Sequence, residues 1–457
     1  MKQTFSSLAL GPSELVFGRA KHPIIRNGVS IGSGSVLPEI KFTLSSISIE
    51  EATREEIRSQ YSEMITDVCQ RAVDLHQSQL VVEFELLPQM TVESHWGVMI
   101  TELLKEVMEQ FRSTEGLQSL LRVTPTDTRE FKKPPLRREG RELEDVLTSF
   151  RTCANAGGDL LSIESTGGKE VTDQAIMETD VRGMLFGVGV LAAADMEFLW
   201  ERICEIAHET ATIPAGDTAC GIANTAMVLA DKHYIPKVFA AVVRAMTAVR
   251  SLIAYEAGAI GPGKDCGYEN AYIKAITGFP MSMEGKSAAC AHLSTVGNIA
   301  GAYTDLWSNE SVQNVKLLSA MAPVVSMEQL IYDCRLFNTS LRGGKEMDLR
   351  DLLVDSDSSL DPQAFIFRPE IVQMLSATII AGRSHYEKTL SVALATAACL
   401  DQGVKDGTLL LSQREQKWLH KIAGELADLP TEEGQFIEEE KRKWLGHVDL
   451  AQYGLPR

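Results

Sequence analysis

Three glycine-rich segments of this 457-residue chain each carry a carboxylate or a thiol beside small, polar residues. They are IESTGGKE (163–170), AGDTACGIANTA (215–226) and YEAGAIGPGKDCGYE (255–269). Together they offer Glu164, Cys220 and Cys266, a ligand set that suits Zn²⁺, which binds sulfur, nitrogen and oxygen tetrahedrally. Three protein ligands leave one coordination position open, as in catalytic zinc sites. The residue types therefore predict a zinc site that can take a substrate.

The opposing interpretation is that Cys220 and Cys266 are buried packing residues, as most free cysteines are. A polar, glycine-rich loop is an unusual setting for a core cysteine, so the residue types leave both interpretations open. The sequence contains eight cysteines without a CxxC pair, and neither a disulfide framework nor a zinc ribbon is expected.

Residues 258–264 (GAIGPGK) match the GxxxxGK part of a phosphate-binding loop. The next residue is Asp265, where a serine or threonine would hold Mg²⁺, and a carboxylate there would repel phosphates. Pro262 also lacks the backbone N–H group that such a loop uses. The segment is therefore not expected to bind a nucleotide.

Short apolar runs that are typical of β-strands alternate with helical patterns from about Leu80 onward. The expected strands are 80–85, 120–124, 159–164, 184–190, 210–216, 251–256 and 279–284, with 315–319 as the candidate for an eighth. This alternation favours a parallel α/β sheet, and eight strands would close a TIM (β/α)8 barrel. The active site of such a barrel lies where the strands end, so residues far apart in sequence can meet there.

The barrel is expected to span residues 76–325. Residues 1–75 form an N-terminal extension that is irregular at first and helical from about Ser48. Residues 326–457 read as additional C-terminal helices packed on the barrel, and they are expected to build oligomer or partner contacts more than chemistry.

Composition excludes several classes of function. With 44 basic and 62 acidic residues the net charge is -18, which disfavours nucleic acid and anionic membrane surfaces as partners. The longest apolar run, 184–194, is well short of the ~20 residues that span a bilayer. The N-terminus is too polar for a signal peptide, so a cytoplasmic location with reduced thiols is expected.

The chain closely resembles the zinc-containing catalytic subunit of the methanol:corrinoid methyltransferases. The matching stretches are LLSIESTGGKEV, AGDTACGIANTAM, SLIAYEAGAIGPGKDCGYEN, KAITGFPMSMEGK and LWSNESV. The resemblance implies a TIM barrel whose zinc is held by a glutamate of ESxGGKE and by the cysteines of GDTxC and GPGKDCGYE. Carried over to this sequence, the zinc ligands are Glu164, Cys220 and Cys266.

The implied activity is transfer of the methyl group of methanol to Co(I) of a corrinoid (cobalamin). Zinc would act as a Lewis acid on the alcohol oxygen. A proton donor to the departing oxygen would help, and Asp217, Glu256, Lys264 and Glu284 are candidates by position.

The corrinoid is expected to come from a partner protein that docks over the barrel mouth, because the chain lacks the DxHxxG signature associated with cobalamin-binding domains. The resemblance implies a homodimer within a heterotetramer with two corrinoid subunits. Two alternatives stay open: the same zinc chemistry with a methylamine or an aromatic methyl ether, or a non-catalytic zinc-stabilised scaffold for a corrinoid protein.

Overall fold

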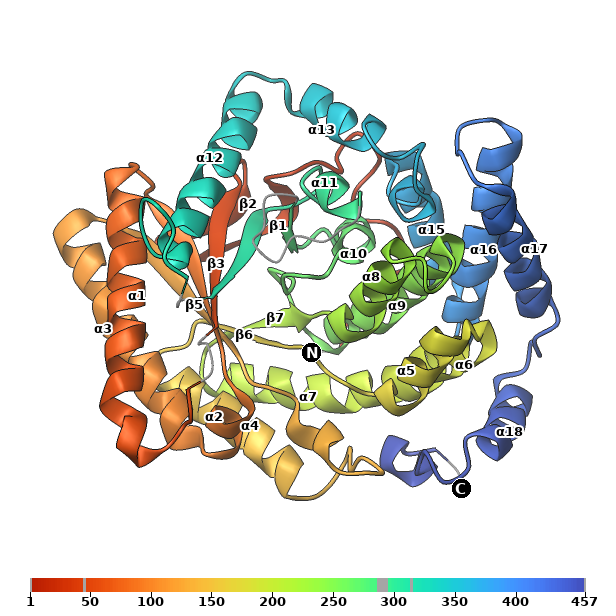
Figure 1. Ribbon diagram of the computed structural model, residues 1–457, viewed down its shortest axis with the longest axis horizontal. Coiled ribbons are helices and arrows are strands. Elements are labelled where there is room, and N and C mark those ends of the chain that lie inside the picture. Colours follow the sequence, from red (N-terminus) through yellow and green to blue (C-terminus); the bar gives the residue numbers. More distant parts are fainter. Residues whose placement is uncertain (1, 44–46, 286–294, 313–314, 456–457) are drawn as a thin grey trace.

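The computed structural model describes residues 2–43, 47–285, 295–312 and 315–455. Within these residues, helices surround a curled parallel β-sheet (Figure 1). The sheet has seven strands in the order β7-β6-β5-β4-β3-β9-β8. Its strands are β3 (Leu37–Thr43), β4 (Gln79–Glu85), β5 (Gln118–Thr124), β6 (Leu160–Ile163), β7 (Ile213–Asp217), β8 (Ser282–Glu284) and β9 (Leu306–Val312).

Helices follow each strand and continue after the last one. Those before β9 are α1 (Arg54–Asp74), α2 (Pro88–Val92), α3 (Ser94–Glu115), α4 (Arg141–Asn155), α5 (Lys169–Glu178), α6 (Val181–Leu185), α7 (Ala193–Glu209), α8 (Thr225–Asp231), α9 (Lys237–Ala257), α10 (Asn270–Thr277) and α11 (Val296–Ala300). Those after β9 are α12 (Ala322–Arg342), α13 (Glu346–Asp355), α14 (Pro362–Phe365), α15 (Pro369–Ala381), α16 (His385–Lys405), α17 (Gln413–Ala427) and α18 (Glu433–Lys443).

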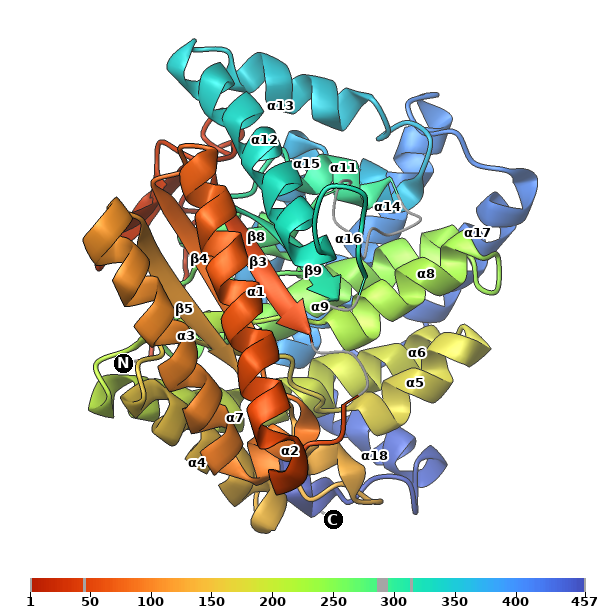
Figure 2. The same cartoon turned by 60° about the vertical axis from the view of Figure 1, so that its left-hand side comes forward.

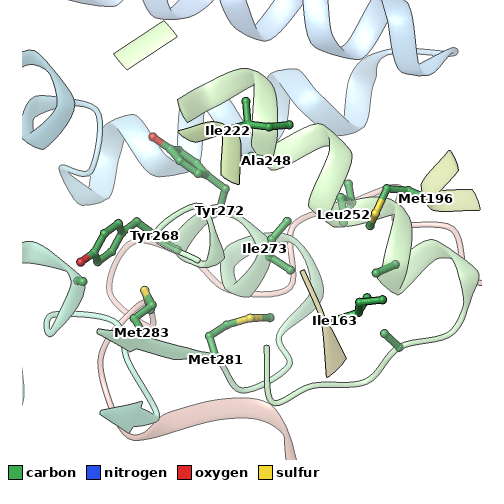
Figure 3. Close-up of a cluster of buried hydrophobic side chains, with 14 of the residues drawn as sticks. Ile163, Met196, Ile222, Ala248, Leu252, Tyr268, Tyr272, Ile273, Met281 and Met283 are labelled. Carbon is green, nitrogen blue, oxygen red and sulfur yellow. The ribbon is translucent and has the colours of Figure 1, made fainter. Parts of the chain in front are cut away.

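Side chains on the outer face of the sheet pack against these helices. Figures 1 and 2 show α1, α3 and α12 along one side of the sheet, and α12 contacts both β3 and β9. Figure 3 shows Ile163 of β6 and Met283 of β8 among apolar side chains that include Leu252 of α9 and Ile273 of α10. All four are at most 2% exposed. The outer face is therefore an ordinary apolar core.

The inner face of the sheet begins apolar and becomes polar toward the strand ends. A small apolar cluster joins residues near the strand starts, such as Leu37, Leu120 and Leu160, to Ile24 and Ile31. The last two belong to an antiparallel hairpin of β1 (Arg19–Arg26) and β2 (Val29–Ser33). The hairpin therefore covers the N-terminal ends of the strands.

Two residues further along each strand, the inner side chains are charged or polar. On β3 they are Glu39 and Lys41, which alternate with the outward-packed Ile40 and Phe42. Arg122 of β5 reaches across the interior and donates to Glu39 Oε1 at 2.7 Å. The C-terminal half of the interior is therefore a buried network of charges.

Residues 260–263 lie between the two edge strands of the sheet. The N–H of Ile260 donates to the Pro214 carbonyl on the β7 side at 2.9 Å. On the β8 side, the Gly263 N–H donates to the Pro280 carbonyl at 3.0 Å, and the Ser282 N–H donates to Gly263 at 3.2 Å. This irregular segment, which leads to Cys266, is hydrogen-bonded to both edges.

Two of the expected strands are wrong. Residues 184–190 are helical, lying at the end of α6 and in the π-helical segment Phe186–Ala192, and residues 251–256 are the last part of α9. Residues 184–190 are apolar throughout and 251–256 are apolar between Ser251 and Glu256, and a short apolar run does not distinguish a buried strand from a buried helix. Residues 315–319 are not a strand either; Lys316 makes only an isolated bridge with Met321.

Two strands of the sheet, β3 and β9, were not expected from the sequence. Their inward side chains include Glu39, Lys41 and Ser308, so neither reads as an apolar run. β3 lies between β4 and β9, so the sheet includes part of the segment expected to be an N-terminal extension. The division into 1–75, 76–325 and 326–457 stays a prediction.

Two helical stretches have the length and composition of membrane spans, Val181–Glu209 and Lys237–Ala257. Their apolar windows are 83% and 100% buried inside the protein. Such burial is typical of core helices, so their composition is weak evidence for a membrane span.

The buried network predicts a large loss of stability when Arg122 is replaced. In addition to Glu39, Arg122 donates to the carbonyls of Pro262 and Gly263, at 3.0 and 3.3 Å. Arg122→Leu leaves Glu39 buried without its cation, which should lower the free energy of unfolding by about 3–5 kcal/mol. Denaturant unfolding followed by circular dichroism measures the change.

The matched control is Arg151→Leu, which removes a surface pair with Glu209. Exposed pairs contribute at most about 1 kcal/mol, so this variant should unfold almost like the wild type. Equal midpoints for the two variants would contradict the structural role of Arg122.

Candidate metal centre

Glu164, Cys220 and Cys266 meet at one point of the structure. Their ligand atoms all lie within 4.8 Å of one another. Glu164 follows β6, Cys220 follows β7, and Cys266 lies between α9 and α10. All three therefore lie beyond the sheet edge where β6 and β7 end, as the sequence predicts.

Local backbone features hold these residues in place. Cys220 opens a π-helical turn (Cys220–Asn224), and such turns are frequent at functional sites. Cys266 has a φ of 55°, a left-handed conformation that is uncommon for a residue other than glycine. Gly168, in the loop after Glu164, has a φ of 75°, and a Cβ there would lie 2.2 Å from the Gly187 carbonyl oxygen. The ligand loops therefore adopt conformations that few sequences tolerate.

Glu284 of β8 also lies beside the thiols. The Cys266 thiol donates to Glu284 Oε1 at 3.1 Å, and Asp265, Cys266 and Glu284 form a second group of ligand atoms within 4.8 Å. A hydrogen bond with Cys220, burial, and the charges of Asp265 and Glu284 raise the pKa of Cys266 well above its usual value. A bound cation would offset this effect, since metal coordination favours the thiolate.

Two buried lysines, Lys41 and Lys264, lie close to the Glu164 carboxylate. Lys41 Nζ lies 2.5 Å from Glu85 Oε2 and 3.8 Å from Glu164 Oε1. Lys264 Nζ lies 3.3 Å from Glu164 Oε1. Burial alone would lower the pKa of Lys41, but nearby carboxylates, Glu85 first, outweigh it and raise this pKa. Both ammonium groups therefore stay charged and compensate the carboxylate.

Lys264 also pairs with two further carboxylates, those of Glu83 and Asp265. Its Nζ lies 2.9 Å from Glu83 Oε1 and contacts Asp265 Oδ1 more closely. Burial, helped by the charge of Asp265, raises the pKa of Glu83 to about 8. Burial acts on Asp265 in the same direction, but Lys264 and Lys41 hold its pKa well below the usual range. Asp265 is therefore the anion that faces Lys264.

The structure does not bring Asp217 or Glu256 into the cluster. Asp217 Oδ1 accepts from Arg250 at 3.0 Å and from the Ser165 N–H at 3.2 Å, and its Oδ2 accepts from Trp200 at 2.8 Å. Asp217 thus anchors the loop after Glu164, with both oxygens occupied.

Glu256 lies at the other end of the sheet. It lies on the last turn of α9. The chain then leads to Ile260, whose N–H donates to the Pro214 carbonyl near the start of β7. The Glu256 carboxylate pairs with Lys388 Nζ at 2.6 Å. The sequence placed Glu256 at a strand end, and the correction follows from residues 251–256 being helical. Of the four candidate proton donors, Lys264 and Glu284 are the two in the cluster, Lys264 beside Glu164 and Glu284 beside Cys266.

Sequence reasoning missed Lys41 and Glu83 as parts of the site. The available signal was alternation: LPEIKFT (37–43) places Glu39 and Lys41 two residues apart between apolar residues. Such alternation is typical of a strand with one polar face, here the face turned to the interior.

A cavity of about 190 Å³ opens beside Glu164. Its lining comes from the ends of β4 and β5 and from the loops after β6 and β7 and includes Glu85, Thr124, Asp127, Glu164, Gly221 and Ile222. The cluster is therefore next to a space that a small substrate can enter.

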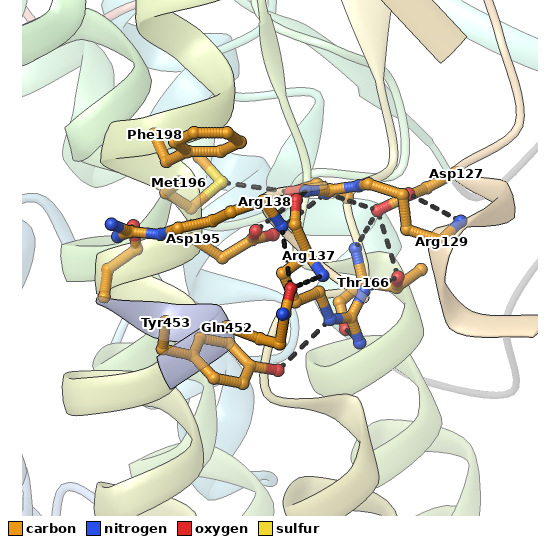
Figure 4. A network of polar contacts seen from close by, with 12 residues as sticks. Asp127, Arg129, Arg137, Arg138, Thr166, Asp195, Met196, Phe198, Gln452 and Tyr453 are labelled. Carbon is orange, nitrogen blue, oxygen red and sulfur yellow. Dashed lines mark hydrogen bonds and ion pairs between the residues drawn. The ribbon is translucent and has the colours of Figure 1, made fainter. Parts of the chain in front are cut away.

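The loop that follows Glu164 is held by a buried network that includes the C-terminal segment (Figure 4). Arg137 donates to Thr166 Oγ1 at 2.7 Å and to the Thr166 carbonyl at 2.9 Å. Tyr453, in the short helix Leu450–Tyr453, accepts from the Gly168 N–H at 3.0 Å and donates to Glu170. The loop is thus tied at Thr166 to Arg137, and at Gly168 and Glu170 to Tyr453, which lies almost 300 positions away in sequence.

Comparison with known proteins assigns the chain to a family. Residues 2–454 match the family model described as methanol-cobalamin methyltransferase B subunit. A methanol–corrinoid protein co-methyltransferase of Methanosarcina barkeri is 37% identical over 442 residues, covering 96% of this chain and 95% of that protein. The structure of a methanol:cobalamin methyltransferase complex, MtaBC, from the same species matches with a TM-score of 0.95 and 36% identity, over 99% of this chain and 100% of that chain.

Removing the Tyr453 hydroxyl should loosen the Glu164 loop. Tyr453→Phe leaves the buried Gly168 N–H and Glu170 without this partner, at an expected cost of about 1–3 kcal/mol of stability. Thermal unfolding measures the loss, and hydrogen exchange should become faster in residues 165–168. Tyr332→Phe is the control, because Tyr332 is 51% exposed. Unchanged exchange in Tyr453→Phe would show that the C-terminal segment does not hold the loop.

Proposed function

Since the chain belongs to the methanol-cobalamin methyltransferase B subunit family and is a methyltransferase, we propose that it uses zinc to transfer the methyl group of methanol to Co(I) of a corrinoid. The corrinoid is carried by a partner protein that docks over the cavity. One observation carries the proposal: Glu164, Cys220 and Cys266 converge within 4.8 Å beside that cavity.

The donor set fits zinc better than the other common metals. Two thiolates and one carboxylate are ligands that Zn²⁺ accepts, whereas Mg²⁺ and Ca²⁺ select oxygen ligands. When bound, zinc supplies a Lewis acid that stabilises negative charge on the alcohol oxygen. Glu164, Cys220 and Cys266 would hold it, and the side facing the cavity leaves room for the substrate.

Glu284 is the residue we assign to the proton. Transfer of a methyl cation equivalent from methanol to Co(I) leaves hydroxide, which needs one proton to depart as water. Glu284 lies beside the proposed site, because the Cys266 thiol donates to its Oε1 at 3.1 Å. In this role Glu284 would relay one proton from solution to the departing oxygen in each turnover, whereas Lys264 is engaged by Glu83, Glu164 and Asp265.

Two features offset the weak acidity of a metal with three anionic ligands. Lys41 and Lys264 lie 3.8 and 3.3 Å from Glu164 Oε1, and their charges reduce the negative charge that this carboxylate donates. Both lysines are buried, so water screens their fields little.

Three wider inferences accompany the proposal. The sheet closes as a TIM (β/α)8 barrel in which residues 260–263 take the place of the eighth strand, supported by their hydrogen bonds to both edges. Two copies of this chain assemble with two corrinoid proteins, and the enzyme works in the cytoplasm. The acidic net charge supports a partner other than nucleic acid or an anionic membrane.

The metal assignment predicts one zinc ion per chain that depends on both thiols. Cys220→Ala and Cys266→Ala should each lose zinc in elemental analysis after dialysis, because two ligands no longer hold it firmly. Cys204→Ala, which changes a half-buried cysteine of α7, should keep it. Full zinc occupancy in both ligand variants would refute the site.

The substrate assignment predicts that methanol methylates cob(I)alamin faster than a methylamine or a methoxylated aromatic compound does. Methanol has two heavy atoms and gains at most roughly 1.5 kcal/mol from each, so a tight cavity wall must exclude larger alcohols. The measurement is the rate of methylcobalamin formation from methanol, a methylamine and a methoxylated aromatic compound. A faster rate from either alternative donor would overturn methanol as substrate, and no rate from any donor with zinc bound would favour the scaffold interpretation.

A further inference from the structure

Asn224 connects the two cysteine loops of the metal centre. It is the last residue of the π-helical turn that begins with Cys220 and is 4% exposed. Its amide Nδ2 lies 3.5 Å from Cys220 Sγ and donates to the Cys266 carbonyl at 2.9 Å. One side chain thus contacts a ligand sulfur and the backbone of the second ligand.

A buried arginine fixes which way the Asn224 amide points. Arg244 of α9 donates from Nη1 to Asn224 Oδ1 at 2.7 Å and from Nη2 to the Ala223 carbonyl at 3.2 Å. An arginine only donates hydrogen bonds, so the oxygen of the amide must face Arg244 and the NH₂ group must face the thiols. The NH₂ group of Asn224 therefore points to Cys220 Sγ and to the Cys266 carbonyl.

Arg244 is connected to the loop after β7 through Glu269, which directly precedes α10. Its Nη1 lies 3.7 Å from Glu269 Oε2. Glu269 Oε1 accepts from the Ala219 N–H at 2.7 Å and from the Ser251 hydroxyl at 2.9 Å. Ala219 directly precedes Cys220, so the chain of contacts returns to the first thiol.

We propose that Asn224 is a positioning residue that orients both thiolate ligands and reduces the charge of the Cys220 sulfur. This inference rests on the proposed zinc site. An N–H donor beside a thiolate draws electron density from the sulfur, so the sulfur donates less to the metal. The bound metal stays more acidic toward the alcohol oxygen. Hydrogen bonds of this kind to metal ligands orient the ligands and tune the metal.

The test compares cobalt-substituted enzymes, because Co²⁺ bound to thiolates has a sulfur-to-metal charge-transfer band. Asn224→Ala and Asn224→Asp both remove the N–H donor, and the second keeps a partner for Arg244 if the first does not fold. In each folded variant the band should move to lower energy, since a more electron-rich sulfur is oxidised more easily. Asn224→Ala should also bind zinc about 10–100-fold more weakly in a chelator competition.

Asn338→Ala is the matched control. Asn338 also makes two hydrogen bonds to backbone, both to Val36, but it lies on α12 away from the thiols. This variant should match the wild type in both measurements. Folded Asn224 variants with wild-type spectrum and zinc affinity would overturn the inference while leaving the zinc site intact. A wild-type enzyme without the band would overturn the zinc site itself, and the inference with it.

Discussion

Charges enclosed by the sheet must be paired with opposite charges, and this requirement shapes the structure around the metal centre. An unpaired charge in a buried position costs several kcal/mol, so each buried ammonium or guanidinium has carboxylate partners within reach. Lys41 and Lys264 approach the same oxygen of Glu164, and Arg122 joins Glu39 to the segment that leads to Cys266. The positions of the loops that carry Glu164 and Cys266 therefore depend on charged side chains buried inside the sheet.

The same requirement explains which parts of the fold the sequence could predict. Strands β4, β5 and β6 read as apolar runs, and residues at their ends were placed correctly. Strands β3 and β9 carry charged or polar residues on the inner face, so their sequences look like loops. Residues 184–190 and 251–256 show the opposite error. They were predicted to be strands but are helical, because helices that are buried on all sides are as apolar as strands. Three-dimensional packing, which the sequence does not display, separates these cases.

The convergence of Glu164, Cys220 and Cys266 was predictable from the sequence because the features that point to these residues are local. A thiol or carboxylate in a glycine-rich loop is informative by residue type and context, and the three loops needed only a common sheet edge to meet. Asn224, Lys41 and Glu83 were not accessible in that way, since each acts through contacts with residues distant in the chain. Glu256 shows the reverse: its residue type was suitable, but a helix places it at the wrong end of the sheet.

The proposed one-carbon substrate, methanol, would make this supporting structure necessary. Methanol offers too little surface for binding energy to organise the site when it arrives, so the geometry must exist beforehand. The contacts that supply it come from across the chain: Lys41 from the first strand of the sheet, Arg244 from α9, and Tyr453 from the C-terminal segment. Lys41 and Tyr453 act on Glu164 and the loop that follows it, and Arg244 acts on the turn that begins with Cys220. The proposed use of so small a substrate therefore depends on contacts between the candidate ligand loops and residues far from them in the sequence.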